Sequence, residues 1–144
     1  MRVLLDTNVV VSALLFGGHP RELLRLLCDP LFELWTSRPL LRELGATLSH
    51  PKLAPALERT EITVERLVQA YAAQALVVPD HALSTASFPE DPSDADVIAA
   101  AEAAAVDWLV SGDHHLLGNP QVIPGTVLSV TDALTQVRAL LASS

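Results

Sequence analysis

The stretch that decides the fold lies near the start of the chain and reads Val3-Leu4-Leu5-Asp6-Thr7-Asn8-Val9-Val10-Val11. Its first part, together with Arg2, predicts a short buried strand over residues 2–5. Asp6 follows that strand directly, and a second apolar segment continues to Phe16. Ligands of open α/β sheets bind just outside the carboxyl ends of the strands. Asp6 is therefore a candidate site residue.

Predicted strands and helices alternate along the rest of the chain. We expect strands at residues 31–36, 76–78, 108–110 and 126–130, and helices at 20–28, 37–49, 63–76, 94–105 and 131–141. The segment with Pro51 and Pro55 is expected to be a surface connection, 81–90 an irregular loop, and 114–117 one helical turn. Ser37, Thr63 and Thr131 are expected N-caps, and Ser93 or Asp94 caps the helix at 94–105.

This alternation predicts the fold class. Strands that alternate with helices form a parallel sheet with helices on both faces. We therefore expect one domain, residues 1–144, with an α/β fold: a three-layer α/β/α sandwich around a central parallel sheet of about five strands.

The composition agrees with that architecture. The chain is 50% hydrophobic but only 4% aromatic, so leucine, valine and alanine are expected to build the core. No apolar stretch approaches the ~20 residues that a membrane span needs. The N-terminus shows no signal-peptide pattern, because Asp6 interrupts its apolar run. Cys28 is the only cysteine, which excludes an internal disulfide and favours a cytoplasmic location.

Charge is unevenly distributed along the chain. The net charge of −8 argues at first against nucleic-acid binding. However, residues 67–137 contain no lysine or arginine, whereas one earlier segment contains Arg21, Arg25, Arg38, Arg42, Lys52, Arg59 and Arg66. This split predicts a basic rim near an acidic pocket. The alternative is a solvated acidic surface that keeps the protein soluble.

Four acidic residues are expected to meet at the carboxyl edge of the sheet. Two follow predicted strands, one lies within the helix at 37–49 and one opens the helix at 94–105; they are Asp6, Asp113, Glu43 and Asp94. Carboxylates brought together repel each other, so such a cluster needs protons or a cation. A hard divalent ion with oxygen ligands satisfies this need.

Each acid also has an ordinary structural interpretation. Asp6 and Asp94 could cap the helices that follow them. Glu43 could be a surface residue beside arginines, and Asp113 could be a turn residue in which Gly112 permits a tight turn. Asp96 competes with Asp94, because two residues along a helix rotate a side chain by about 200° and both cannot easily face one ion.

Three stretches resemble the motifs of PIN-domain ribonucleases. They are residues 5–15 (Leu5-Asp6-Thr7-Asn8 onward), residues 91–101 (Asp91-Pro92-Ser93-Asp94 onward) and residues 107–117, which contain Ser111-Gly112-Asp113. The last is similar in particular to toxins of toxin–antitoxin pairs (VapC-like). The resemblance covers nearly the whole chain. It favours a helix over residues 7–16 although three consecutive valines oppose one, and it favours Asp94 over Asp96.

The resemblance implies a metal-dependent endoribonuclease. Mg²⁺ or Mn²⁺ would be held by Asp6, Asp94 and Asp113, with Glu43 binding directly or through water, and hydrolysis would leave a 5′-phosphate and a 3′-hydroxyl. Ser111 resembles a residue that hydrogen-bonds the first aspartate, and Asn8 and Ser12 are further candidate supporting residues. RNA is then the expected substrate, and its backbone would be bound by Arg21, Arg25, Arg38 and Arg42. An antitoxin and a homodimer are the expected protein partners.

The chain also departs from the family pattern, and other functions stay open. Relatives often carry a further aspartate two residues after Asp113, where this chain has His115. One alternative is a non-catalytic PIN-like domain that binds RNA or protein. Another is a haloacid-dehalogenase-like phosphatase, which also has an aspartate after its first strand but needs a second at the position of Asn8.

Overall fold

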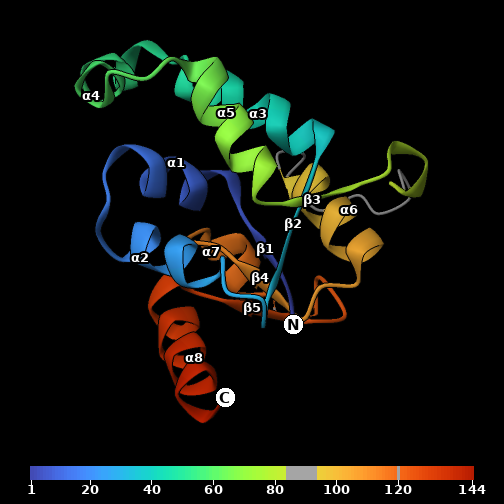
Figure 1. Cartoon of the computed structure of the whole chain (residues 1–144). Coiled ribbons are helices and arrows are strands. Elements are labelled where there is room, and N and C mark those ends of the chain that lie inside the picture. Colours follow the sequence, from blue (N-terminus) through green and yellow to red (C-terminus); the bar gives the residue numbers. More distant parts are fainter. Residues whose placement is uncertain (84–93, 120) are drawn as a thin grey trace.

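The computed structural model describes residues 1–83, 94–119 and 121–144 (Figure 1). Strands and helices alternate along it. The elements are β1 (Arg2–Leu5), α1 (Thr7–Leu15), α2 (Gly18–Leu26), β2 (Glu33–Ser37), α3 (Arg38–Leu48), α4 (Ala54–Thr60), α5 (Val64–Ala73), β3 (Leu76–Val78), α6 (Ala95–Ala104), β4 (Trp108–Val110), α7 (His114–Leu117), β5 (Thr126–Leu128) and α8 (Val130–Ser143). Short 3-10 turns lie at Pro51–Leu53 and Asp80–Ala82.

The sheet formed by the described residues has five strands in the order β3-β2-β1-β4-β5, and each neighbouring pair is parallel. β1 is the central strand, so Leu5 pairs in register with Val110 of β4, and Leu4 pairs with Trp35 of β2. The carboxyl ends of these three strands therefore lie side by side. The expected fold class, with about five parallel strands, is confirmed.

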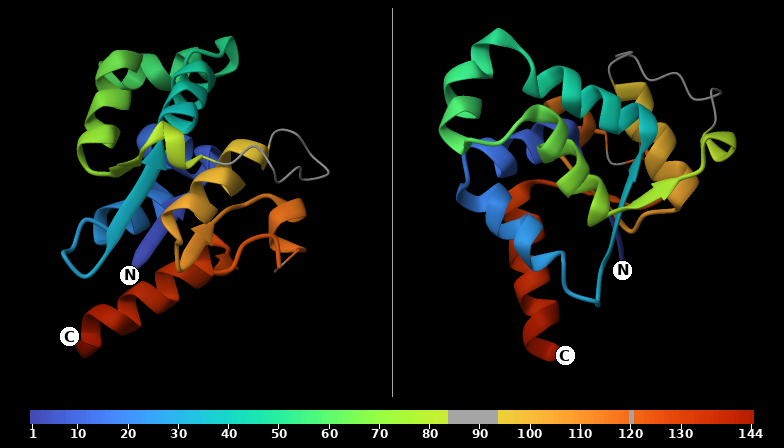
Figure 2. Two further views of the ribbon diagram at one scale, coloured as in Figure 1. Left: turned by 90° about the vertical axis from the view of Figure 1, so that its right-hand side faces the viewer. Right: turned by 45° about the horizontal axis from the view of Figure 1, so that its top comes forward.

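Helices cover both faces of the sheet, as the two further views show (Figure 2). Side chains of a strand alternate between the faces: Val3 and Leu5 of β1 join a core cluster with residues of α1, α2 and α8, whereas Leu4 joins a second cluster dominated by α6. The three valines of α1 are all buried. Tertiary packing therefore outweighs their low helix propensity.

Several element boundaries differ from the sequence-based expectation. The segment with Pro51 and Pro55 contains the helix α4, because Pro55 lies in its first turn, where a missing N–H costs nothing. The second strand begins at Glu33 rather than Leu31, because the Asp29 side chain accepts from the Leu31 N–H and holds that segment in a turn. Similarly, α2 begins at Gly18, before Pro20.

The expected caps are partly confirmed. Ser37 and Thr63 cap α3 and α5 through their side chains, at 3.3 Å to the N–H of Leu40 and 3.3 Å to that of Arg66. The last helix is capped by Ser129, not by Thr131, so β5 ends at Leu128. Ser93 and most of the expected loop at 81–90 lie outside the described residues.

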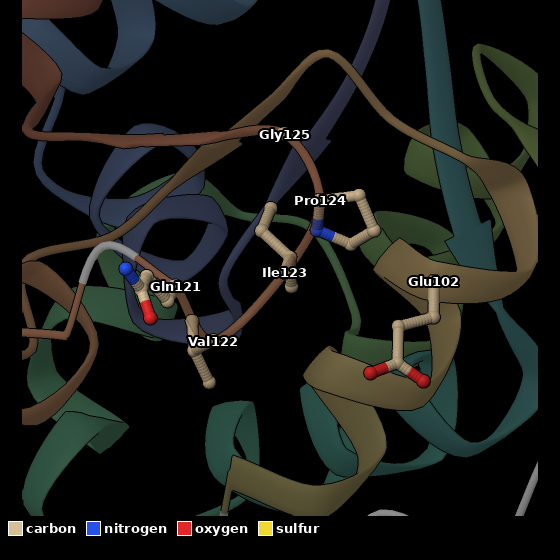
Figure 3. A pocket seen from close by; sticks show the side chains of 6 residues that line it. All are labelled: Glu102, Gln121, Val122, Ile123, Pro124 and Gly125. Atoms are coloured by element: carbon tan, nitrogen blue, oxygen red, sulfur yellow. The ribbon is translucent and has the colours of Figure 1, made fainter.

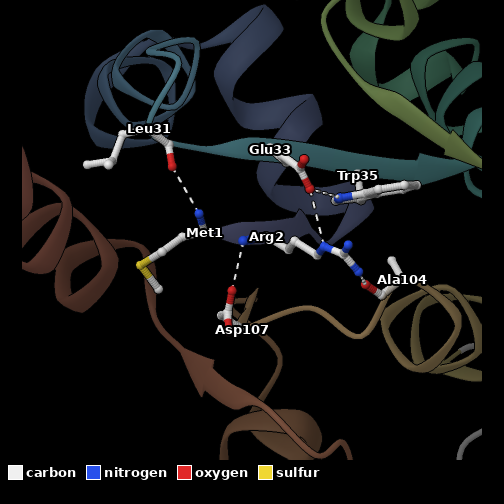
Figure 4. Close-up of polar contacts among 7 residues, drawn as sticks. All are labelled: Met1, Arg2, Leu31, Glu33, Trp35, Ala104 and Asp107. Carbon is white, nitrogen blue, oxygen red and sulfur yellow. Dashed lines mark hydrogen bonds and ion pairs between the residues drawn. The ribbon is translucent and has the colours of Figure 1, made fainter.

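The amino edge of the sheet is held by polar contacts (Figure 4). The N-terminal ammonium group donates to the Leu31 carbonyl at 2.9 Å. The Arg2 backbone N–H donates to Asp107 at 2.8 Å, and its guanidinium pairs with Glu33 at 3.2 Å. These contacts connect β1 with the segments before β2 and β4. The described acids at this edge are thus used in structural contacts.

Gly125 should tolerate no side chain. A Cβ at this position would lie 2.7 Å from the Asp107 carbonyl oxygen and closer still to that of Val106. The next N–H, that of Thr126, donates to the same Asp107 carbonyl at 2.9 Å, so the two backbones cannot separate without loss of this bond. We expect Gly125→Ala to lower the free energy of unfolding by about 1–3 kcal/mol, measured by urea denaturation.

Gly112→Ala is the matched control, because a Cβ there meets nothing within 4 Å and Gly112 lacks a positive φ. Equal losses of stability in the two variants would contradict the proposed backbone clash at Gly125.

Candidate active site

Two of the four candidate acids lie at the ends of neighbouring strands. Asp6 directly follows β1, and its backbone N–H donates to the carbonyl of Val110, the last residue of β4, at 2.9 Å. Asp113 follows β4 by three residues and is the N-cap of the short helix α7. Because β1 and β4 are parallel neighbours, both aspartates stand at the carboxyl edge of the sheet, where α/β proteins bind ligands.

A chain of hydrogen bonds orients these two aspartates. The fully buried Ser111 donates its hydroxyl to Asp6 Oδ2 at 2.8 Å and accepts from the Asp113 backbone N–H at 2.9 Å. This is the contact that the family resemblance implied for Ser111. The second oxygen of Asp6 accepts from the Thr7 N–H at 2.8 Å. Asp6 is therefore fixed through both of its oxygens.

Glu43 reaches the same region from helix α3. Ser37 at the end of β2 caps this helix, and α3 packs against α1, whose N-cap is Asp6. The Thr7 side chain lies near enough to Glu43 to lower the pKa of that carboxyl. Glu43 is only half-buried, so its carboxylate remains accessible to a ligand from solvent. Its neighbours Leu40 and Leu44 are buried and anchor the helix.

The carboxylates at this edge repel one another. Burial, and to a lesser extent the charge of Asp113, raises the pKa of Asp6 above its usual value, against the lowering effect of the hydrogen bonds from Ser111 and Thr7. Burial also raises the pKa of Glu43, followed by the charges of Asp6, Asp96 and Asp94, against the hydrogen bond from Thr7. The acids of β1, α3 and α6 thus form one electrostatic cluster.

Asp94 and Asp96 differ sharply in environment. Asp94 is buried, with 6% exposure, whereas Asp96 is exposed on α6. Asp94 stands at the N-cap position of α6, but its side chain makes no capping hydrogen bond. Its position agrees with the expected cap of this helix, and an electrostatic effect on the helix N-terminus is compatible with it. Asp94 is withdrawn from solvent beside the acidic cluster, which favours it over the exposed Asp96 as a candidate ligand.

The donor set agrees with a hydrated divalent ion. Among the described residues, no three histidine, cysteine or acidic side chains already surround one point closely enough to hold an ion by themselves. Mg²⁺ keeps several of its waters and is usually bound through one or two carboxylates. Oxygen donors from Asp6 and its acidic neighbours meet that requirement, whereas a dehydrated, tetrahedral zinc site would not be built from them.

The predicted RNA-binding arginines have different surroundings. The Arg21 guanidinium donates to the carbonyls of Ala13 and Leu14 in the last turn of α1, at 2.9 and 3.2 Å. It therefore stabilises the end of that helix. Arg38 pairs with Asp80 at 3.1 Å on the surface.

The other two predicted RNA-binding arginines and the two predicted supporting polar residues lie at or near the surface. Arg25 lies 4.0 Å from Glu22, and Arg42 is exposed next to Glu43 on α3. Asn8 is exposed and Ser12 is half-buried on α1. The described contacts bring neither of these two polar residues to the four acids, so their supporting role stays a prediction.

Thr7 is the residue that the sequence analysis did not single out. It lies between Asp6 and Asn8 in the opening motif and is buried with 4% exposure. Its position, a β-branched polar residue where a strand meets a helix, could have pointed to Thr7. The sequence alone does not show that Glu43 lies near its side chain.

The described cavities lie elsewhere. One pocket of about 450 Å³ is formed by the segment before β5 and by Glu102 of α6 (Figure 3). Gly125, one of its lining residues, immediately precedes the first residue of β5. This pocket is therefore at the amino edge of the sheet, opposite the acidic cluster, and it plays no part in the site.

We expect the acidic cluster to make stability depend on pH and on metal. A carboxyl with a raised pKa in the folded state contributes stability at low pH that is lost as the pH rises through the folded pKa. Between about pH 4 and 7, the free energy of unfolding of the metal-free wild type should therefore rise less than that of metal-free Asp6→Asn. Mn²⁺ should stabilise the wild type at neutral pH but not Asp6→Asn, as measured by urea unfolding.

The exposed Asp132 of α8 offers the matched control for that measurement. Asp132→Asn should keep the pH dependence and the Mn²⁺ response of the wild type. The same pH dependence in all three proteins would contradict the proposed repulsion at Asp6.

Comparison with known proteins places this arrangement in a family. No curated protein matches the sequence significantly. Among solved structures, the chain is similar to a chain in the crystal structure of VapBC2 from Rickettsia felis bound to a DNA fragment from their promoter, with a TM-score of 0.62 and 15% identity over 90% of this chain and 98% of that one. The family model of the PIN domain matches residues 2–115, which include Asp6, Glu43, Asp94 and Asp113. The chain therefore belongs to the PIN-domain family.

Proposed function

We propose that this protein is a metal-dependent endoribonuclease and the toxin of a toxin–antitoxin pair. The observation that carries the proposal is the gathering of Asp6, Glu43, Asp94 and Asp96, in which burial and neighbouring negative charges raise the pKa of Asp6 and of Glu43. Such clusters are characteristic of functional sites, because like charges gathered at one place repel each other and lower the stability of a domain. The haloacid-dehalogenase-like alternative does not agree with the family match.

In this proposal the acids hold the ion and position water. Asp6, Asp94 and Asp113 would contact Mg²⁺ or Mn²⁺, and Glu43 would contact it directly or through a water. One ion, or two ~4 Å apart, lowers the pKa of a bound water and offsets the negative charge that develops on the phosphate. Ser111 and the Thr7 N–H keep Asp6 oriented for this task. Hydrolysis would leave a 5′-phosphate and a 3′-hydroxyl.

Single-stranded RNA is the proposed substrate, because its backbone and bases are more accessible to a site at the edge of a sheet than those of a duplex. Arg42 and Arg38 are the best-placed candidates for phosphate contacts: they stand one helical turn apart on α3, and Arg42 adjoins Glu43. Arg21 is a weaker candidate, since its guanidinium already serves the carbonyls of α1.

The experiment that tests the function is cleavage of a panel of single-stranded RNAs by purified protein. We expect cleavage with Mg²⁺ or Mn²⁺ and none with EDTA. Arg42→Ala should raise KM and flatten the dependence on salt while Mn²⁺ affinity stays unchanged. Release of phosphate from small phosphomonoesters without RNA cleavage would favour the phosphatase, and no turnover of either substrate would favour a binding domain.

The antitoxin partner is proposed from two observations. The similar solved structure is a VapBC2 complex, and an apolar groove of about 400 Å³ lies between α3 and α5, lined in part by Leu41, Val64 and Val68. A homodimer would use the same kind of surface, and light scattering at micromolar concentration tests it. Induced expression in a bacterium should arrest growth and create new RNA 5′ ends, and Asp6→Asn should do neither.

A further inference from the structure

An ion pair lies at the carboxyl edge of the sheet, beside the strand that leads to Asp6. β2, the neighbour of β1, ends at Ser37, and Arg38 is the first residue of α3. β3 pairs with β2 so that Val78 lies beside Ser37, and Asp80 follows two residues later. The Arg38 guanidinium donates to Asp80 Oδ2 at 3.1 Å. The register of these two strands therefore brings the arginine and the aspartate together (Figure 1).

The backbone around Asp80 is restrained by a short turn. Pro79, whose ring fixes φ near −60°, precedes it. Asp80 then opens the 3-10 turn, in which the Ala82 N–H donates to the Pro79 carbonyl at 2.9 Å and the Leu83 N–H donates to the Asp80 carbonyl at 3.2 Å. The short carboxylate side chain is thus presented from a defined turn to the beginning of α3.

This ion pair contributes little to the stability of the fold. The Arg38 and Asp80 side chains are 70% and 58% exposed. Water screens such a pair, and both side chains lose conformational freedom when they form it. Another anion can therefore replace the carboxylate at little cost. A phosphodiester presents two oxygens to a guanidinium, as a carboxylate does, so RNA and Asp80 are alternative partners for Arg38.

Arg42 provides the contrast within the same helix. It stands four residues after Arg38, and residues at this spacing share one side of a helix. Arg42 is exposed, and within the part of the chain that the structure describes it forms no ion pair. Of these two candidate phosphate ligands, one is therefore open to an anion, whereas the other already holds a carboxylate.

We propose that Asp80 holds the Arg38 guanidinium in the place of an RNA phosphate and is displaced when RNA binds, so that Asp80 sets the affinity of the protein for RNA. The inference rests on the proposed nuclease function. Asp80 is a positioning residue that acts through Arg38 and touches neither the reacting phosphate nor the ion. Its negative charge weakens RNA binding, because the ion pair must open before Arg38 can contact the backbone.

A double-mutant cycle of Asp80→Asn with Arg38→Ala tests this role without cleavage. The probe is a fluorescein-labelled oligouridine, and its binding is followed by fluorescence anisotropy in EDTA. We expect Asp80→Asn to tighten binding about threefold or more at low salt. In the Arg38→Ala background the same substitution should change the Kd less than about 1.5-fold. Asp80→Glu keeps the charge and should remain within about twofold of the wild type.

The cleavage reaction gives a second measurement. With Mn²⁺ and RNA, Asp80→Asn should lower KM by a similar factor with little change in kcat, because the substitution changes binding and leaves the acids of the site intact. Asp132→Asn removes an exposed charge on α8 and is the control for net charge, so its RNA affinity should equal that of the wild type.

The outcomes separate this inference from the proposed function. Equal tightening by Asp80→Asn in both backgrounds, or wild-type affinity in Asp80→Asn, would overturn the role of Asp80 even if the wild type cleaves RNA. Coupling between Asp80 and Arg38 in a protein that binds RNA but does not cleave it with Mn²⁺ would instead overturn the nuclease function and support the role of Asp80. No binding of the probe by any variant would overturn both.

Discussion

Asp6→Asn should reduce RNA cleavage at least about 10³-fold, which corresponds to a loss of about 4 kcal/mol of transition-state stabilisation. Asp6 is the acid most firmly placed in the site: Ser111 and the Thr7 N–H fix its two oxygens, and Val110 accepts from its backbone. Asparagine retains the shape but removes the negative charge that an ion requires. Isothermal calorimetry with Mn²⁺ should therefore show that most of the binding is lost.

The substitution should not unfold the protein. Asparagine is as good an N-cap as aspartate, and it removes a charge whose pKa is raised because burial disfavours it. The metal-free variant should thus be at least as stable as the wild type near neutral pH. Asp132→Asn, an exposed acid on α8, is the control and should keep full activity. Wild-type Mn²⁺ affinity in Asp6→Asn would remove the basis of the proposed function.

Much of the fold could be predicted because the strong patterns are local. The strands at Arg2–Leu5, Leu76–Val78 and Trp108–Val110 were expected with these bounds, and the caps Ser37 and Thr63 had clear signals. One error arose because proline occurs both after the ends of helices and in their first turns. Pro55 ends nothing, since it stands in the first turn of α4. Propensity alone also misjudged α1, whose valines are helical because both the sheet and α2 bury them.

The site was less predictable, because its residues meet only in three dimensions. The order of acids and the family resemblance pointed to Asp6, Asp94, Asp113 and Glu43, and strand ends explain two of them. The contact from Thr7 to Glu43 could not be anticipated, because it depends on the packing of α3 against α1. The Arg21 contacts to α1 likewise follow from the tight turn between α1 and α2. The distribution of charge along the sequence does not reveal which arginines already bind backbone carbonyls of their own chain.

The choice between Asp94 and Asp96 gives the second large effect. We expect Asp94→Asn to lower kcat/KM for RNA cleavage about 10²–10³-fold, and Asp96→Asn to lower it less than about fivefold. Asp94 is buried beside the cluster and makes no side-chain capping hydrogen bond, whereas Asp96 is exposed. The charges of Asp94 and Asp96 both raise the pKa of Glu43, so proximity to Glu43 does not tell which of the two is the ligand. Their difference in burial does, because a carboxylate withdrawn from water gains most from contact with a cation.

The two variants control for each other, because they make the same chemical change two residues apart at the start of one helix. Each removes one negative charge near the N-terminus of α6, so a general electrostatic effect on the cluster or on the helix dipole would weaken activity similarly in both. A ligand effect would appear in Asp94→Asn alone, together with weaker Mn²⁺ binding and unchanged urea unfolding. The reverse order of effects would show that the exposed face of α6, rather than its buried beginning, supplies the third acid.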